Sequence, residues 1–317
     1  MNSRAWRLLS GAAGIFLLAW LAHRAGTDAI AAALVRLDPA WLLVWLGLFF
    51  VVAFGIAWRW SLLVRALGIE VGVRELVAMW FCGVTVGSAT AGAKLGGDPL
   101  RAWLLARRSS ETGRAIASVI ADRGIELTVN LVFAIAYCLI FALGDAELAE
   151  DMLIAVLVIA VVQGVMVVFL LRRLRSKRSL VPARFRGVFA RFPRGAEAAA
   201  DAESALHELL VERRPQALRA VGAAFVVNAL IFVEFAVAFR VFGAAPDLSE
   251  LAGSIMGVGL AHAIPVPGSV GTLEGAQVLV FGAGGAAGLM VVAAIVARMR
   301  DLVRAIPGAI LLLLRQP

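Results

Sequence analysis

Charged residues, cysteine and histidine are all scarce in this sequence. Only 16% of its 317 residues are charged and 62% are hydrophobic, whereas a soluble domain has about 25% charged residues. The core of a soluble protein of this size cannot bury so much apolar surface, so an ordinary soluble domain is excluded. The two cysteines and three histidines form no CxxC motif and no Cys/His cluster, so neither a disulfide framework nor a zinc site is supported.

Motifs of the common enzyme classes are also missing. The patterns GxxxxGK[ST], HExxH and GxSxG do not occur. We therefore expect a protein that is not an enzyme and that has no cofactor and no metal.

Long apolar runs are what the sequence does contain, and its mean hydropathy is +0.90. About 20 helical residues at 1.5 Å each cross the ~30 Å hydrocarbon core of a bilayer. The pattern predicts one all-α, polytopic membrane domain with six full spans and two broken or re-entrant hairpins, about eight hydrophobic helices. The apolar segments are 8–22, 40–58, 76–91, 115–143, 152–171, 219–242, 251–264, 275–285 and 286–314.

Charge distribution orients these segments. Residues 172–219 contain twelve Lys/Arg and five acidic residues. All the charged residues in 144–151 are acidic. The positive-inside rule therefore places 172–219 in the cytoplasm and 144–151 outside, with both termini cytoplasmic. We expect a bacterial inner-membrane protein whose net charge of +8 reflects orientation rather than nucleic-acid binding. Within the basic region, 197–213 has the pattern of a helix lying on the membrane surface, or one that covers the bundle.

An internal repeat appears at an offset of 175 residues. Arg65 and Gly68 then coincide with Arg240 and Gly243, and Arg123 with Arg298. Three crossings separate the copies, so the second is inverted. We predict a first span and external loop (1–39), repeat 1 (40–143), a linking span with a basic loop (144–218) and repeat 2 (219–317). Chance similarity between Gly-rich helices is the alternative.

Charges inside the predicted spans are candidate functional residues, because each costs about 2.5–3.5 kcal/mol at a helix centre. Arg298, Asp301 and Arg304 share one helix face, and Arg123 and Glu126 repeat this spacing. They either line a polar cavity or form ion pairs that hold the bundle together. Arg59 and Glu234 occupy equivalent repeat positions, and we predict that they form an ion pair.

The two predicted hairpins are broken near glycine and an acid. Non-helical backbone at membrane depth is tolerated where it lines a protein or water-filled interior, and exposed helix ends there can hold a headgroup or ion. His262 precedes the second break and is either a proton carrier or a packing residue. The candidate binding residues at the breaks are Gly96, Gly97, Asp98 and Arg101, and Pro265, Pro267, Gly268, Gly271 and Glu274.

Three features together resemble the flippase-like membrane region of lysylphosphatidylglycerol synthases and its free-standing bacterial relatives. They are GGDPLRAWLLARR (96–108), the helix with Arg123 and Glu126, and PVPGSVGTLE (265–274). The sequence departs from the family pattern at Ser269, usually glycine, and at Asp122, commonly Glu. The resemblance implies lipid translocation between leaflets, with no synthase activity, because the chain stops at Pro317. Some relatives occur with hopanoid biosynthesis.

We therefore expect a membrane lipid transporter that moves or binds a phospholipid or a hopanoid-type lipid. The alternative is a non-catalytic partner or scaffold of a lipid-modifying enzyme. A membrane enzyme acting on headgroups is a further rival that lacks an acid/base constellation. The expected partner is a membrane lipid, and the oligomeric state is left open.

Overall fold

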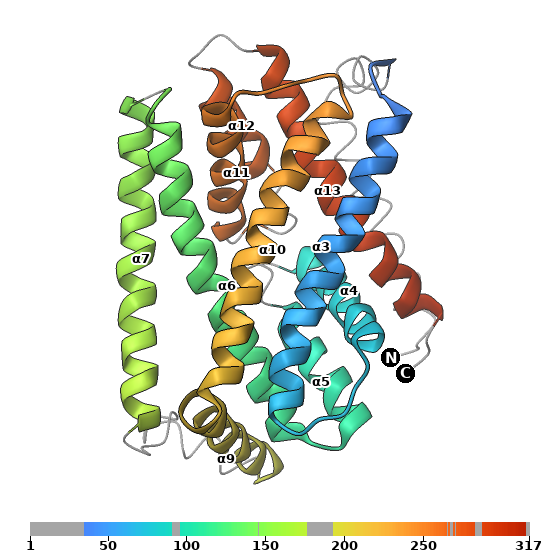
Figure 1. The fold of residues 1–317 in the computed structure, drawn as a ribbon, viewed down its shortest axis with the longest axis vertical. Coiled ribbons are helices and arrows are strands. Elements are labelled where there is room, and N and C mark those ends of the chain that lie inside the picture. The colour runs from blue at the N-terminus through green and yellow to red at the C-terminus, as the bar shows by residue number, and fades with distance from the viewer. Residues whose placement is uncertain are drawn as a thin grey trace.

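A computed structural model describes residues 35–90, 96–144, 146–175, 193–264, 266, 269, 271–282 and 287–314. The predicted first span at 8–22 lies outside these residues. The regular structure in the described part is helical, which confirms the predicted fold class (Figure 1). Its helices are α3 (Pro39–Ala66), α4 (Val73–Ala89), α5 (Gly97–Ser109), α6 (Thr112–Phe141), α7 (Ala146–Arg175), α9 (Pro193–His207), the π-helical turn η1 (Glu208–Glu212), α10 (Arg214–Arg240), α11 (Leu248–Ala263), α12 (Thr272–Gly282) and α13 (Ala287–Leu314).

Helix boundaries repeat with the offset that the sequence indicates. The first residues of α10, α11, α12 and α13 each lie 175 positions after those of α3, α4, α5 and α6. Helix α10 begins at Arg214, five residues before the predicted start of repeat 2. Each unit is thus a long helix, a hairpin of two shorter helices and a second long helix. Helices α7 and α9 lie between the units.

The ends of α3 and α10 have the same turn. Gly68 and Gly243 have φ of 76° and 67°, a left-handed conformation that glycine adopts without the cost of a Cβ. The amides that follow, Ile69 N and Ala244 N, both donate back to a carbonyl five residues earlier, at 3.1 Å. The two copies therefore share backbone hydrogen bonds as well as sequence positions.

The two units run in opposite directions. The amide of Asp38, the N-cap of α3, donates to the carbonyl of Val241 at the end of α10, at 2.9 Å. The start of one helix thus lies beside the end of the other, and the two helices pack side by side along their length (Figure 1). Because α3 and α10 are equivalent, their antiparallel packing makes the repeat inverted.

The first helix of each hairpin packs against the other unit, whereas the second, α5 or α12, packs against α6 or α13 of its own unit. Helix α4 packs against α13 of the other unit, and α11 packs against α6. Thr85 Oγ1 donates to the carbonyl of Ala305 at 2.7 Å, and Ser249 Oγ donates to that of Phe141 at 3.1 Å. The charged helices α6 and α13 therefore each contact both hairpins.

Four helices in the described part are long and apolar enough to cross a membrane: α3, α6, α10 and residues 150–169 of α7. Helix α13 is also long enough, but its three arginines and one aspartate make it more polar than these four helices. Helices α4 and α5 lie in the lower half of the view in Figure 1, and α11 and α12 in the upper half, as expected for broken hairpins. The count of six full spans stays a prediction.

The amphipathic segment predicted at 197–213 is helical and covers one end of the bundle. Ala202, Leu206 and Leu209 are buried there against α3, α6 and α10. A Cβ on Gly113 of α6 would overlap Asp201 and Ala202, so the absence of a side chain permits this close contact.

Candidate functional site

Buried and half-buried charged side chains gather in two clusters, one in each repeat. The N-terminal cluster comprises Arg59, Asp98, Arg101, Asp122, Arg123 and Glu126, on α3, α5 and α6. The C-terminal cluster comprises Glu234, His262, Glu274, Arg298, Arg300, Asp301 and Arg304, on α10, α11, α12 and α13.

Asp122 is the centre of the N-terminal cluster and is fully buried. Its two carboxylate oxygens accept hydrogen bonds from Arg59 Nε and Arg101 Nη2, both at 2.8 Å. The guanidinium of Arg101 also lies 4.2 Å from the ring centroid of Trp60. One carboxylate therefore joins α3, the hairpin helix α5 and α6.

Asp98 begins the second half of the first hairpin and joins it to α6. It accepts from Arg123 Nε at 2.7 Å and from Arg101 Nη1 at 3.3 Å. Glu126 contacts Arg123 at 3.4 Å and Arg59 at 3.3 Å. Three arginines and three carboxylates thus neutralise one another.

Arg298 holds the second hairpin. Its Nε and Nη2 donate to the two oxygens of Glu274 at 2.6 and 2.7 Å, and Nη2 also donates to the carbonyl of Ser269 at 3.0 Å. The amide of Gly271 donates to the same carboxylate at 3.0 Å. The pairing of an arginine on the long helix with an acid on the hairpin repeats the contact of Arg123 with Asp98.

Arg300 joins α13 to α10 through Glu234. Its Nε donates to both carboxylate oxygens, at 2.8 and 3.0 Å, and its Nη2 bonds to Glu234 as well. Trp45 Nε1 donates to the same carboxylate at 2.8 Å, and the guanidinium packs over Phe235. Since Glu234 is fully buried, this paired arginine is what makes its burial tolerable.

The contacts of Asp301 and Arg304 differ from those of the other charged residues in the two clusters. Asp301 Oδ2 lies 3.2 Å from His262 Nε2 of α11. Arg304 is half-buried and is near enough to Asp301, Glu126 and Glu234 to interact electrostatically, yet within the described ranges no carboxylate lies within 4.0 Å of it. It differs in this from the five other arginines of the two clusters.

The predicted ion pair between Arg59 and Glu234 is wrong. Arg59 bonds to Asp122 and Glu126 of α6, and Glu234 bonds to Arg300 of α13. Each side chain is satisfied by the charged helix of its own repeat. The equivalent positions on α3 and α10 therefore pair with α6 and α13 and not with each other.

The structure brings many of the candidate residues together. Asp98, Arg101, Arg123 and Glu126 share one cluster, and Glu274 contacts Arg298. Gly97 packs against the backbone of Gly83. Gly96 precedes α5 as its N-cap. Three candidates, Pro265, Pro267 and Gly268, lie outside the described residues.

Sequence reasoning did not assign Asp122, Arg300 or Trp45 to the site. Both charged residues stand in apolar helices, so their cost of insertion was a usable signal. Trp45 carries no such signal, because its role depends on which face of α3 meets α10.

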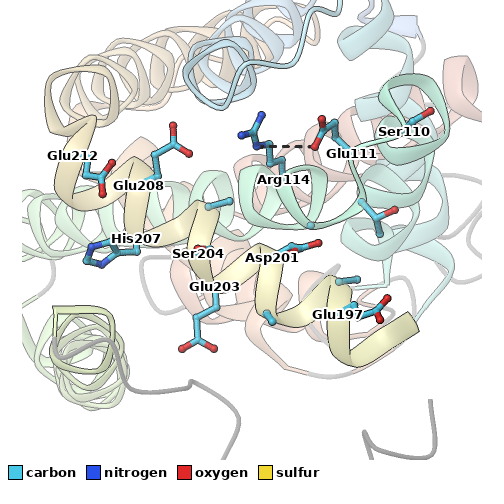
Figure 2. Close-up of a pocket in the computed structure, with 15 residues that line it drawn as sticks. Ser110, Glu111, Arg114, Glu197, Asp201, Glu203, Ser204, His207, Glu208 and Glu212 are labelled. Atoms are coloured by element: carbon cyan, nitrogen blue, oxygen red, sulfur yellow. Dashed lines mark ion pairs between the residues drawn. The ribbon is translucent and has the colours of Figure 1, made fainter. Parts of the chain in front are cut away.

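A pocket lies elsewhere, between the start of α6 and the helix α9 (Figure 2). Six of its fifteen lining residues are acidic, and Arg114 is 4.0 Å from Glu111 there. None of the candidate binding residues is part of this pocket. Its acidic residues are Glu111, Glu197, Asp201, Glu203, Glu208 and Glu212.

Residues 7–308 match the family described as "Lysylphosphatidylglycerol synthase TM region", and the chain belongs to this family of membrane proteins linked to lipid handling. It is similar to a "UPF0104 membrane protein" of Methanothermobacter thermautotrophicus, 28% identical over 281 residues, which are 84% of this chain and 82% of the relative. Another "UPF0104 membrane protein", of Methanocaldococcus jannaschii, is 23% identical over 122 residues, 38% of this chain and 36% of that one. No solved structure gives a significant match. The chain is therefore a multi-pass membrane protein.

Proposed function

We propose that this protein binds a membrane lipid with an anionic headgroup at Arg304 and moves it between the leaflets. The observation that carries the proposal is the half-buried Arg304, which has no carboxylate within 4.0 Å in the described part of the chain. A guanidinium offers five donors in a fork that fits a phosphate. A phosphodiester there would supply the direct contact with a negative charge that no described carboxylate makes within 4.0 Å.

The architecture supports movement as well as binding. Inverted repeats with broken helices at their interface are typical of transporters that expose a central site to each side in turn. Arg304 lies on α13, which contacts the hairpin helices of both units, α4 and α12. Movement of either hairpin could therefore change the environment of a headgroup bound at Arg304.

The setting that we propose is a bacterial inner membrane, with both termini in the cytoplasm and no catalytic activity. A phospholipid is the substrate class that Arg304 favours. A hopanoid-type lipid is the other substrate class, and the protein would recognise it by its polar group.

A scaffold for a lipid-modifying enzyme is the second candidate function. It is favoured by the extensive pairing of the other charges, since six of the seven basic residues in the two clusters contact a carboxylate. Under this alternative the charges hold the bundle together and no lipid moves.

Reconstitution in liposomes separates the two functions. Exchange of fluorescent phosphatidylglycerol, phosphatidylcholine and a hopanoid between leaflets would be measured for wild type, Arg304→Gln, Arg304→Lys and Arg108→Gln at equal protein density. Arg108 is the matched control, because it is an exposed arginine paired with Glu75.

We expect Arg304→Gln to slow phosphatidylglycerol exchange by roughly tenfold or more, the loss of one charge-assisted contact. Arg304→Lys should recover part of the rate, and Arg108→Gln should match wild type. Wild-type protein that exchanges none of the lipids would favour the scaffold, and equal rates for Arg304→Gln and wild type would remove Arg304 from the site.

A further inference from the structure

His262 is a titratable group that belongs to only one of the two repeats. It lies in the last turn of α11, next to the break of the second hairpin, and contacts Asp301 on α13 at 3.2 Å. The equivalent positions in repeat 1 are Gly87 and Glu126, so no such contact can form there. The pair therefore gives the C-terminal cluster a property that the N-terminal cluster lacks.

Two cationic side chains of the described residues, His262 and Arg304, are near Asp301. Arg304 follows it by three residues on the same helix, a spacing at which an acid and an arginine ordinarily interact. Asp301 is instead within hydrogen-bond distance of His262, and Arg304 lies more than 4.0 Å from it. Of the three carboxylates that interact electrostatically with Arg304, the one on its own helix is thus in contact with the imidazole.

We propose that His262 is a proton-binding site that controls whether Arg304 is available to an anionic group. When His262 is protonated, its positive charge holds Asp301, and Arg304 is free to bind an anion. When His262 loses its proton, the attraction weakens and Asp301 turns to Arg304. Proton and anion therefore bind together, and the site couples lipid movement to the proton gradient. The coupling to lipid rests on the function proposed above.

The described carboxylates on α12, α6 and α10, which pack against α11, each contact an arginine. Glu274 of α12 is held by Arg298, Glu126 of α6 by Arg59 and Arg123, and Glu234 of α10 by Arg300. On α11 itself, Glu250 lies at the opposite end, where it closes a capping box with Asp247. Histidine is the side chain in this group whose ordinary charge change falls between about pH 5 and 8.

Linkage fixes the direction of the effect. Because the protonated form is the one that binds the anion, affinity for the anion is highest at low pH and falls as pH rises. Conversely, binding of the anion takes up a proton from solution.

Binding of short-chain phosphatidylglycerol to the purified full-length protein tests this coupling. Affinity would be measured at about pH 5.5 and about pH 8, which bracket the titration of histidine. Proton uptake on binding would be recorded in weakly buffered solution. Thermal unfolding at both pH values would show that each variant is folded.

Wild-type affinity should fall by roughly tenfold or more between the two pH values, a usual size for coupling between two sites. His262→Gln keeps a hydrogen-bonding group without the charge, so it should bind weakly at both. Asp301→Asn removes the competitor of the anion, so it should bind tightly at both. Neither variant should take up a proton.

The outcomes separate this inference from the proposed function. Affinity that is independent of pH in wild type, but lost in Arg304→Gln, would overturn the proton site and leave the anion site in place. Weak binding by Asp301→Asn at both pH values would also overturn it, because the competitor would then be a required contact. Binding that Arg304→Gln leaves unchanged would overturn both.

Discussion

Asp122 is a single buried carboxylate on which the pairing of two arginines depends. Two arginines from different helices share it, and it is fully buried. Removing one member of a buried ionic group leaves the others charged and unpaired, which costs more than the group contributes when intact.

We predict that Asp122→Ala destabilises the protein by about 3–5 kcal/mol. Both Arg59 and Arg101 would lose their closest acid. The measurement is thermal unfolding in detergent, with yield after purification as a second readout.

Glu75→Ala is the matched control for this change. Glu75 pairs with Arg108 at 2.9 Å, but both side chains are exposed, and such pairs contribute about 1 kcal/mol or less. A loss of stability as large for Glu75 as for Asp122 would contradict the importance given to burial.

At the residue scale, the sequence predicts which positions carry charge at membrane depth but not how they pair. The spacing of Arg298, Asp301 and Arg304 indicates a polar helix face, and all three occur in one cluster. The partner of each depends on distances between helices, which no local pattern contains. Hence the prediction for Arg59 and Glu234 failed.

Gly253 allows α11 to pack closely against its neighbours. A Cβ on Gly253 would lie 2.6 Å from the ring of Phe141 on α6 and 3.0 Å from Val280 on α12. Gly259 of the same helix has no atom within 4 Å of its Cβ position. The contact between the second hairpin and the opposite repeat thus depends on one missing side chain.

We predict that Gly253→Ala lowers the stability of the protein by about 1–3 kcal/mol, because the added methyl group overpacks this contact. Gly259→Ala should be neutral or stabilising by up to about 1 kcal/mol, since alanine favours the helix more than glycine. Unfolding of the two variants under identical conditions checks the difference. Equal effects would mean that α6 can shift to make room.

Much of the element scale is predictable from the sequence. The offset of 175 residues that a few matching positions indicate also relates the first residues of four pairs of helices. The packing of the first helix of each hairpin against the other repeat is not predictable in this way. It depends on complementary surfaces of α4 with α13 and of α11 with α6, whose residues are far apart in the chain.

At the scale of the whole molecule, inversion places equivalent loops on opposite sides of the membrane. Glu70 and Ala245 follow the two equivalent glycine turns, and both are exposed. Cys82 and Cys138 are buried and can be replaced by alanine to give a background without cysteine.

We predict that Glu70→Cys and Ala245→Cys react with a membrane-impermeant maleimide from opposite sides. Labelling of intact cells and of inside-out vesicles measures this. A cysteine at Glu197 in α9 serves as a control, and it should react from the same side as Glu70, since α9 covers that end of α3. Labelling of Glu70→Cys and Ala245→Cys from one side would contradict the inverted arrangement.

Helix α7 packs only lightly, with 11% of its apolar window buried, yet it connects the two units. Deleting α7 would remove one membrane crossing, so the second unit would insert with the same orientation as the first. Helices α3 and α10 would then run parallel, and the bond from Asp38 to Val241 could not form. The main role of α7 is therefore to add one membrane crossing, which inverts the second unit relative to the first, and its packing contacts matter less.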